Sequence, residues 1–270
     1  MSNTGEIWSR VRAGEVLKGE EVIDVHAHMG PWFNFHTPDD PWADGMVALM
    51  DACGIGLAIT APLPGIGPDA VWGNRLAAEA AQRFPGRLAA WCTVSPSYSE
   101  AEIVEEMEKY ILKGDFLGIK IHPSMHAHPA DGPNYRVMWA FANEHDLPVL
   151  SHTWKGNWTC EPRMFESIGR EFPRTKILMG HSGATDDGIL ETIQAARNVP
   201  NLYLDLTKSR MQRGVLELMV SGVGSERILF GTDFPFFDCR GMIGFVASAR
   251  ISDQDKRNIF GLNAKRIFGL

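Results

Sequence analysis

Two histidines separated by one residue, His26 and His28, close a short and mostly apolar run at residues 22–28. In a strand, successive side chains point to opposite faces, so these two imidazoles are predicted to point the same way. Two imidazoles side by side at the end of a strand form half of a metal site, because neutral imidazole is a common zinc ligand. The alternative is that both rings only satisfy hydrogen bonds in a core.

Other polar residues have the same position relative to apolar runs further along the chain. They stand at or near the C-terminal ends of predicted strands, whereas a chance arrangement would scatter them among helices and loops. If the strands are parallel and form a barrel, these ends meet at one mouth, where active sites are built. The residues are His26, His28, Lys120, His122, His152, His181, Asp205 and Asp233.

Four of these residues have the chemistry of a zinc site. Three imidazoles and one carboxylate suit zinc and leave a coordination position for water; His26, His28, His152 and Asp233 supply this set. Bound zinc lowers the pKa of its water toward about 7, and Asp233 is placed to accept the proton. We expect His181 to act as a second acid or base, or to donate a hydrogen bond to a developing oxyanion.

The elements that must position these residues alternate along the chain. The predicted strands are near-continuous apolar runs, as parallel strands covered on both faces should be. Eight strand–helix alternations in about 250 residues predict an α/β protein with a (β/α)8 TIM barrel. The predicted strands cover 22–28, 56–60, 88–93, 117–122, 148–152, 176–181, 202–206 and 227–233. The predicted helices cover 46–53, 69–84, 100–112, 135–145, 162–172, 187–198, 211–220 and 243–250, with further helical pattern near Ile259 and Ile267.

The chain start and the loops add three expectations. A leading helix is predicted within 3–18, so residues 1–20 would form a short N-terminal helical extension and 21–270 a single barrel domain. A doubly wound parallel sheet is the alternative to the barrel, but no glycine-rich phosphate loop follows the first strand. Trp32, on the loop after that strand, indicates a pocket for a flat or apolar substrate, or an oligomer contact. The apolar segment 234–237 is expected to form another wall of the same mouth.

Composition excludes several classes of protein. The chain has 270 residues, of which 44% are hydrophobic, and a formal net charge of -7 without a run of Lys or Arg, which argues against a nucleic-acid partner. No apolar stretch approaches the about 18 residues of a membrane span, and the N-terminus lacks the features of a signal peptide. Four cysteines far apart in sequence are interpreted as free thiols of a cytoplasmic protein. They are Cys53, Cys92, Cys160 and Cys239.

Several short motifs occur in an order and at spacings that resemble the amidohydrolase superfamily. Besides His26-x-His28 they are GIKIHP at 118–123, LSHT at 150–153, MGHSG at 179–183 and FGTDFP at 230–235. Within the superfamily, the chain resembles the amidohydrolase-related branch that includes aminocarboxymuconate-semialdehyde decarboxylase, from about residue 22 to the C-terminus. The resemblance implies a divalent metal held by His26, His28, His152 and Asp233, with His181 near the metal-bound water.

Lys120 has two interpretations within this superfamily. In binuclear members, a carboxylated lysine on the fourth strand bridges two metals, and His152 with His181 could then hold the second ion. The FGTDFP segment resembles the mononuclear branch more closely, and there Lys120 would be an ordinary cation that binds a substrate carboxylate. We expect one zinc. His122, on the same face as Lys120, is expected to contact substrate, with a hydrogen-bonded core position as the alternative.

Two further signals are weaker. His126 and His128 repeat the His-x-His spacing, but no apolar strand run precedes them, so we expect a solvated loop. Asp205 either supports the ligands or makes structural hydrogen bonds.

Three functions are compatible with these residues. The leading hypothesis is a metal-dependent hydrolase in which activated water cleaves an ester, lactone or amide bond of a small molecule and Asp233 passes the proton to the leaving group. The alternative is a metal-dependent, non-oxidative decarboxylase of an aromatic or unsaturated acid, in which Lys120 would bind the acid. The third is a metal-binding scaffold without chemistry, which the surplus of acid/base residues disfavours. A homodimer is also expected.

Overall fold

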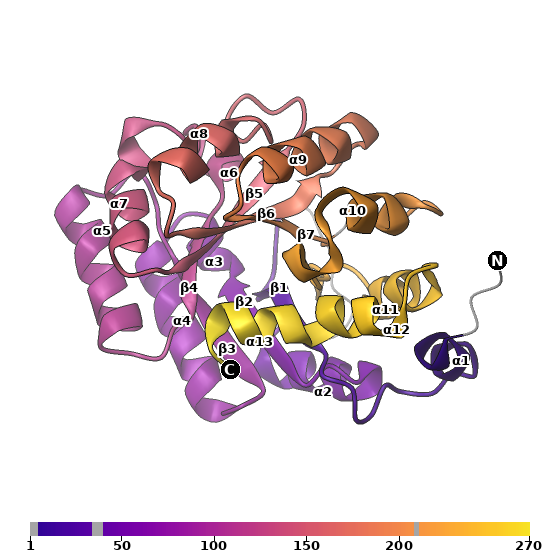
Figure 1. Ribbon diagram of the computed structural model, residues 1–270. Coiled ribbons are helices and arrows are strands. Elements are labelled where there is room, and N and C mark those ends of the chain that lie inside the picture. The colour runs from indigo at the N-terminus through magenta and orange to yellow at the C-terminus, as the bar shows by residue number, and fades with distance from the viewer. Residues whose placement is uncertain (1–4, 34–39, 208–210) are drawn as a thin grey trace.

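The computed structural model describes residues 5–33, 40–207 and 211–270. Eight parallel strands follow one another in chain order as a single sheet that curves into a barrel, and helices cover its outside (Figure 1). The predicted (β/α)8 TIM barrel is confirmed. The strands are β1 Ile23–Met29, β2 Leu57–Pro62, β3 Leu88–Thr93, β4 Gly118–Ile121, β5 Pro148–Trp154, β6 Lys176–Gly183, β7 Leu202–Asp205 and β8 Ile228–Leu229.

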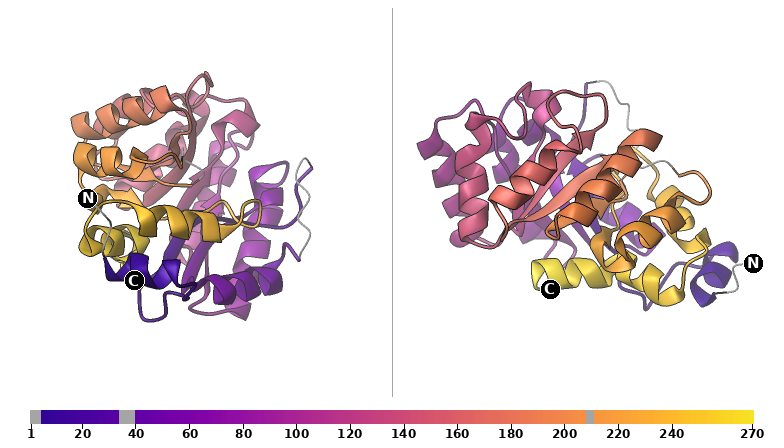
Figure 2. Two further views of the ribbon diagram at one scale, coloured as in Figure 1. Left: turned by 90° about the vertical axis from the view of Figure 1, so that its right-hand side faces the viewer. Right: turned by 45° about the horizontal axis from the view of Figure 1, so that its top comes forward.

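The helices lie around the sheet, as the two turned views also show (Figure 2). They are α1 Glu6–Arg12, α2 Ala43–Cys53, α3 Leu63–Ile66, α4 Ala70–Arg83, α5 Glu100–Met107, α6 Pro123–His126, α7 Arg136–Glu144, α8 Met164–Glu171, α9 Asp186–Asn198, α10 Val215–Val223, α11 Cys239–Ser248, α12 Asp253–Arg257 and α13 Asn263–Phe268. Short 3-10 or π-helical turns complete the pattern: η1 Glu108–Leu112, η2 Pro133–Tyr135, η3 Ser225–Arg227 and η4 Asn258–Leu262.

Side-chain caps define where several helices begin. Ser99 and Glu102 form a reciprocal capping box at the start of α5, and Thr185 accepts a hydrogen bond from Gly188 N at the start of α9. Such caps satisfy N–H groups that have no partner within the helix. Because only two residues separate the end of β6 from the start of α9, the cap also determines how the chain leaves the C-terminal end of that strand.

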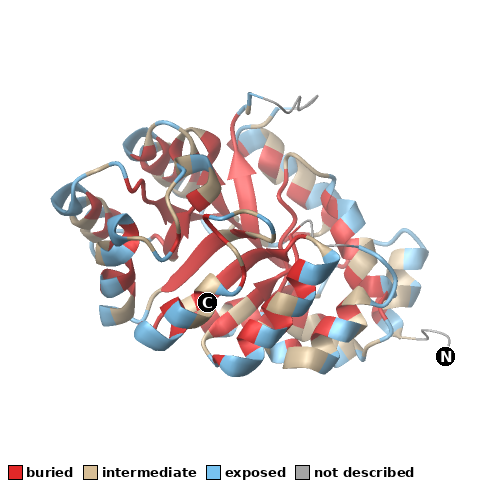
Figure 3. Cartoon of the chain, turned by 90° about the horizontal axis from the view of Figure 1, so that it is seen from above, coloured by how far each residue is buried: buried red, intermediate tan, exposed pale blue. Residues whose placement is uncertain are grey.

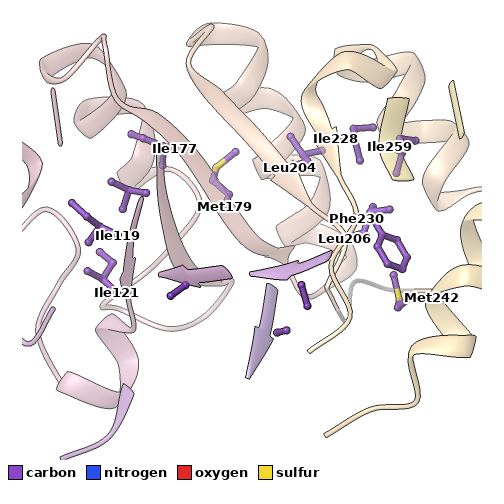
Figure 4. Packing of buried hydrophobic residues seen from close by; sticks show 14 of the residues in the cluster. Ile119, Ile121, Ile177, Met179, Leu204, Leu206, Ile228, Phe230, Met242 and Ile259 are labelled. Carbon is purple, nitrogen blue, oxygen red and sulfur yellow. The ribbon is translucent and has the colours of Figure 1, made fainter. Parts of the chain in front are cut away.

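Buried apolar residues form two clusters, one on each face of the sheet. The larger cluster lies between the strands and the surrounding helices, and Figure 4 shows part of it, including Ile119, Ile121 and Met179. The smaller cluster fills the barrel with strand residues such as Val25 and Leu150 and with Ile267 of α13. The strands are accordingly buried along most of their length, whereas each outer helix alternates buried and exposed residues (Figure 3). The sheet is thus covered on both faces, as the apolar strand sequences predicted.

A shift of register in β1 turns both histidines of the His-x-His motif into the barrel. Val25 belongs to the interior cluster, so strict alternation would place Ala27 inside and His26 outside. The pairing of β1 with β2 shifts between Asp24 and Ala27, and Ala27 instead joins the outer cluster. Bulges re-aim side chains in this way next to active sites. His26 and His28 therefore share the interior face, as predicted.

The barrel closes through the segment that follows β8. The predicted strand 227–233 is shorter in the structure, because the chain leaves the ladder with β7 after Leu229. It continues to bond to β1: Val25 N donates to Phe230 O at 3.0 Å, and Asp233 N donates to His26 O at 2.9 Å. These bonds bring the FGTDFP segment against the His-x-His motif.

The leading helix is shorter than predicted and packs on the barrel. It is limited to Glu6–Arg12, and Ile7 joins the outer core cluster near α11 and α12. Residues 1–4 of the predicted extension lie outside the described residues, and a domain boundary at residue 20 stays a prediction. In the ranges that the structure describes, no helix has both the length and the apolar content that a bilayer crossing requires.

Candidate metal centre

Three potential metal ligands meet where β1 ends and the segment after β8 begins. One donor atom each from His26, His28 and Asp233 lies within 4.8 Å of the other two. Nε2 of His28 is 3.0 Å from Oδ1 of Asp233, and Nε2 of His26 is 3.8 Å from the same oxygen. All three side chains are buried. Two imidazoles and a carboxylate form a donor set suited to zinc and related divalent ions.

Each of the two imidazoles is oriented by a hydrogen bond to its other nitrogen. Nδ1 of His26 lies 2.5 Å from Oδ2 of Asp205, and Nδ1 of His28 lies 3.0 Å from the carbonyl oxygen of Ala61. When Nδ1 donates in both bonds, Nε2 has the lone pair that a metal requires. Metal-binding histidines almost always have such a second partner, so these residues fit a divalent metal.

Backbone geometry brings Asp233 to this position. Asp233 has a φ of 65°, a backbone conformation that residues other than glycine seldom adopt. Two residues earlier, a Cβ on Gly231 would collide with Thr207 Oγ1 and Asp205 Oδ1. A glycine is therefore required for the segment after β8 to approach β7 this closely, and that approach places Asp233 beside the histidines.

The electrostatic surroundings favour the charge states that bind a cation. Burial by itself would raise the pKa of Asp233, but the adjacent His28 and the other nearby imidazoles outweigh it and hold the pKa well below its ordinary value. Burial and the neighbouring Lys120 lower the pKa of His26 well below its ordinary value. Ionised carboxylate and neutral imidazole are the forms that ligate metals.

Lys120 contacts a predicted ligand directly. Its Nζ lies 2.8 Å from Nε2 of His26, and its side chain is fully buried within the barrel. Burial lowers the pKa of Lys120 to about 8. Because a metal on His26 would need the same nitrogen, metal binding requires Lys120 to give up this hydrogen bond. Its predicted roles, a substrate contact or a carboxylated bridge, stay predictions.

His152 and His181 line the same pocket as Asp233. Nδ1 of His181 is 3.0 Å from the carbonyl oxygen of Thr207, and its ring centroid is 5.0 Å from that of His26. His152, on β5 across the barrel from β1, lies 4.6 Å from His181 between ring centroids, and its buried Nδ1 has no hydrogen-bond partner among the described residues. His152 is not part of the three-donor cluster. Its role as fourth ligand and the catalytic role of His181 stay predictions.

The donor cluster opens into a small pocket of about 170 Å³. The predicted contact residues Trp32 and His122 both line it, and so do two phenylalanines of the segment 234–237. Among the described residues, no lysine or arginine is part of this lining. The lining comprises His26, His28, Trp32, Leu63, Ile66, His122, Met125, His152, Trp154, His181, Asp233, Phe236 and Phe237.

Part of the wall comes from two one-turn helices, α3 and α6, that the sequence analysis missed. Ile66 belongs to α3 and Met125 to α6. The expectation of a solvated loop around His126 is wrong, because Nδ1 of His126 lies 2.7 Å from the hydroxyl of Tyr135 and Nε2 lies 3.0 Å from the carbonyl oxygen of Ile66. Pro123 at the first position of α6 is the local signal that could have indicated this turn.

A family model described as Amidohydrolase matches residues 23–270. The chain belongs to the amidohydrolase family. The resemblance inferred from the strand-end motifs is thereby confirmed. Among curated relatives of this amidohydrolase-family chain, gamma-resorcylate decarboxylase of Rhodococcus jostii is 23% identical over 249 residues, which cover 73% of this chain and 75% of that protein.

Solved structures share the barrel. A 2,6-dihydroxybenzoate decarboxylase in complex with 2,6-dihydroxybenzoate has a TM-score of 0.72 and 18% identity, covering 94% of this chain and 100% of that one. The 5-carboxyvanillate decarboxylase of Novosphingobium aromaticivorans, with bound manganese and 3-methoxy-4-hydroxy-5-nitrobenzoic acid, has a TM-score of 0.74 and 17% identity, covering 94% and 98%. At these identities the likeness shows the amidohydrolase-family fold.

These comparisons correct the predicted reaction. The expectation of a hydrolase is wrong, because three curated relatives of this amidohydrolase-family chain are named decarboxylases. The physical reason is that hydrolases and decarboxylases share the barrel and the metal donors. The sequence patterns identified these shared features. The reaction depends instead on the groups that meet the substrate. The candidate site is one for a divalent metal, and zinc in particular stays a prediction.

Proposed function

We propose that this protein is a metal-dependent decarboxylase that releases carbon dioxide from a small aromatic or unsaturated carboxylic acid. The observation that carries the proposal is a buried cluster of metal donors at a small, largely aromatic and apolar pocket, in a chain whose curated relatives are decarboxylases. Hydrogen-bonded imidazoles and an ionised carboxylate prepare this cluster for a cation.

One wall of the pocket is aromatic. The ring of His152 stacks with His122, at 4.1 Å and 15°, and with Trp154, at 5.6 Å and 9°. Rings stacked in this way leave their edges and the outer faces of the stack for a ligand, and a planar substrate can pack against either. These rings support an aromatic or conjugated acid as the substrate class.

The metal would be held by His26, His28 and Asp233, with His152 as the proposed fourth ligand. When bound, a divalent ion supplies positive charge that binds and polarises substrate oxygens. We propose one zinc per chain on the basis of the donor set, with manganese, which the Novosphingobium enzyme contains, as the ion to compare. Lys120, once released from His26, is our candidate for a second positive group near the acid.

The chain itself must deliver a proton. Decarboxylation breaks the bond between the carboxyl carbon and the rest of the substrate and leaves the electron pair on the substrate carbon, which then takes up a proton. Because the apolar walls limit water, we assign this proton to a side chain of the pocket. We propose His181, which the Thr207 carbonyl orients toward the cluster, with Asp233 as the alternative.

To test this, the metal-loaded protein is incubated with 2,6-dihydroxybenzoate or 5-carboxyvanillate and, in parallel, with simple esters and lactones. Carbon dioxide and the products are then measured. We expect carbon dioxide and the decarboxylated product in equal amounts, without ester or lactone hydrolysis. H181Q should keep its metal and lose about 10²–10⁴-fold in kcat, whereas D233N should lose metal as well. Hydrolysis without release of carbon dioxide would contradict the proposal.

Assembly and location are part of the proposal. We propose a homodimer in the cytoplasm that acts on a small molecule, without a nucleic-acid or membrane partner; the net charge of -7 supports the exclusion of nucleic acid. Light scattering of the purified protein measures the dimer directly, and a monomeric mass would contradict it.

A further inference from the structure

Two cysteines that are 186 residues apart meet at the seam of the barrel. Cys53 is the last residue of α2, which follows β1, and Cys239 is the first residue of α11, which follows β8. Their Sγ atoms lie 2.8 Å apart, with Cys239 donating. A disulfide bond has an S–S length of about 2.05 Å, so less than about 1 Å of movement separates this contact from a covalent bond.

The two thiols differ in reactivity. Both are buried, but Cys53 keeps 5% of its surface exposed while Cys239 keeps none. The hydrogen bond from Cys239 lowers the pKa of Cys53, and the same bond together with burial raises the pKa of Cys239. Since the thiolate is the nucleophile, Cys53 is the sulfur that reacts first and Cys239 the sulfur that resolves the product.

The other two cysteines provide an internal comparison. Cys92 is buried, and its sulfur accepts a hydrogen bond from the side chain of Asn74. Cys160 is also buried, and the side chain of Thr159 hydrogen-bonds to the Cys160 thiol. Burial raises the pKa of both thiols. All four cysteines belong to the described part of the chain, and the contact between two sulfurs is that of Cys53 with Cys239.

We propose that Cys53 and Cys239 form an oxidation site that a peroxide converts into an intramolecular disulfide. The Cys53 thiolate attacks one peroxide oxygen; an S–O bond forms, the O–O bond breaks, and the leaving hydroxide or alkoxide takes up the proton that Cys53 released on ionising, so that water or an alcohol leaves. The Cys239 thiol then attacks the resulting sulfenic acid, so that an S–S bond forms and a second molecule leaves as water, taking the thiol proton. Two thiols are oxidised for each peroxide reduced.

The position of the pair determines what the disulfide does. Because β8 has two residues, the closure between β8 and β1 depends on a few backbone hydrogen bonds. A covalent link from α2 to α11 spans this seam and ties the segment that contains Asp233 to the strand that contains His26. The oxidised form is therefore a barrel whose closing seam resists opening.

The test treats the reduced full-length protein with a small excess of hydrogen peroxide and maps peptides without a reductant. We expect a peptide pair that joins Cys53 to Cys239, a mass loss of two hydrogens, and a rise in Tm of about 5 °C or more that dithiothreitol reverses. C53S and C239S should each abolish the link and the Tm rise, whereas C92S and C160S should retain both.

Other outcomes would overturn the proposal. Sulfinic acid on Cys53 without a cross-link would show that Cys239 does not resolve the intermediate, and a link between chains would assign the thiols to a different contact. If C53S or C239S does not fold, the peptide map of the reduced and oxidised wild type decides by itself. Intact free thiols after peroxide treatment, with an unchanged Tm, would also contradict it.

Discussion

The carboxylate of Asp205 on β7 lies 2.5 Å from Nδ1 of His26 on β1, and both side chains are fully buried. The second oxygen of Asp205 accepts hydrogen bonds from the backbone N and from Oγ1 of Thr207, at 3.0 and 2.8 Å. The carboxylate therefore has a defined orientation before it meets the imidazole. With Asp205 on Nδ1, the opposite nitrogen of His26 faces Lys120 and the neighbouring ligands.

Replacing Asp205 should weaken metal binding without removing a ligand. D205N exchanges the carboxylate for an amide that holds the Nδ1 proton of His26 less strongly, so we expect affinity for zinc or manganese to fall about 10–100-fold. Competition with a chelator measures this affinity. T207V should show a smaller loss and T207S none, because serine keeps the hydroxyl bond. Unchanged affinity in a folded D205N protein would contradict this role.

Replacing Lys120 separates its two interpretations. K120M removes the ammonium that occupies Nε2 of His26, so we expect the affinity for metal to be unchanged or higher, with one metal per chain. We expect KM for the acid to rise about tenfold, because the variant loses a charge-assisted hydrogen bond to the substrate. Metal analysis and steady-state kinetics measure both quantities. Two metals per wild-type chain, and none in K120M, would instead indicate a carboxylated bridge.

His126 should make the fold sensitive to acid. Burial lowers its pKa from 6.5 to about 4, so the unfolded chain binds this proton and the folded chain does not between those values. The stability that depends on a neutral His126 is therefore present above pH 6.5 and is lost as the pH falls toward 4. Urea unfolding at pH 7.5 and 5.5 should show H126Q losing about 1 kcal/mol less than wild type over this interval. H145Q, at an exposed histidine, serves as the control and should lose as much as wild type.

Gly231 should tolerate no side chain. In G231A the new Cβ collides with Thr207 and Asp205, so we expect a loss of at least about 2 kcal/mol in the free energy of unfolding and weaker metal binding. Gly244 in α11 is the matched control, because a Cβ there meets no atom of the described residues within 4 Å. G244A should stabilise the protein by about 0.5–1 kcal/mol. Equal effects in the two variants would show that the approach of β8 to β7 is not tight.

The sequence alone determined the barrel and the region of the site. Continuous apolar runs that alternate with amphipathic segments suit parallel strands covered on both faces, and this is a local property of the chain. The same runs end in His26, His28, His181 and Asp233, so a barrel necessarily brings these residues to one end. The apolar wall at 234–237 was identified in the same way.

Tertiary structure decided how those side chains meet. The shift of register in β1 depends on how that strand pairs, so alternation within its own sequence does not reveal it. The partners of His26 are Lys120 and Asp205, which lie 94 and 179 residues away, and no local propensity selects such pairs. The walls from α3 and α6 and the meeting of Cys53 with Cys239 likewise arise from contacts between distant segments. Local sequence encodes which face of each element is apolar, whereas distances between side chains follow only once all eight strands have packed together.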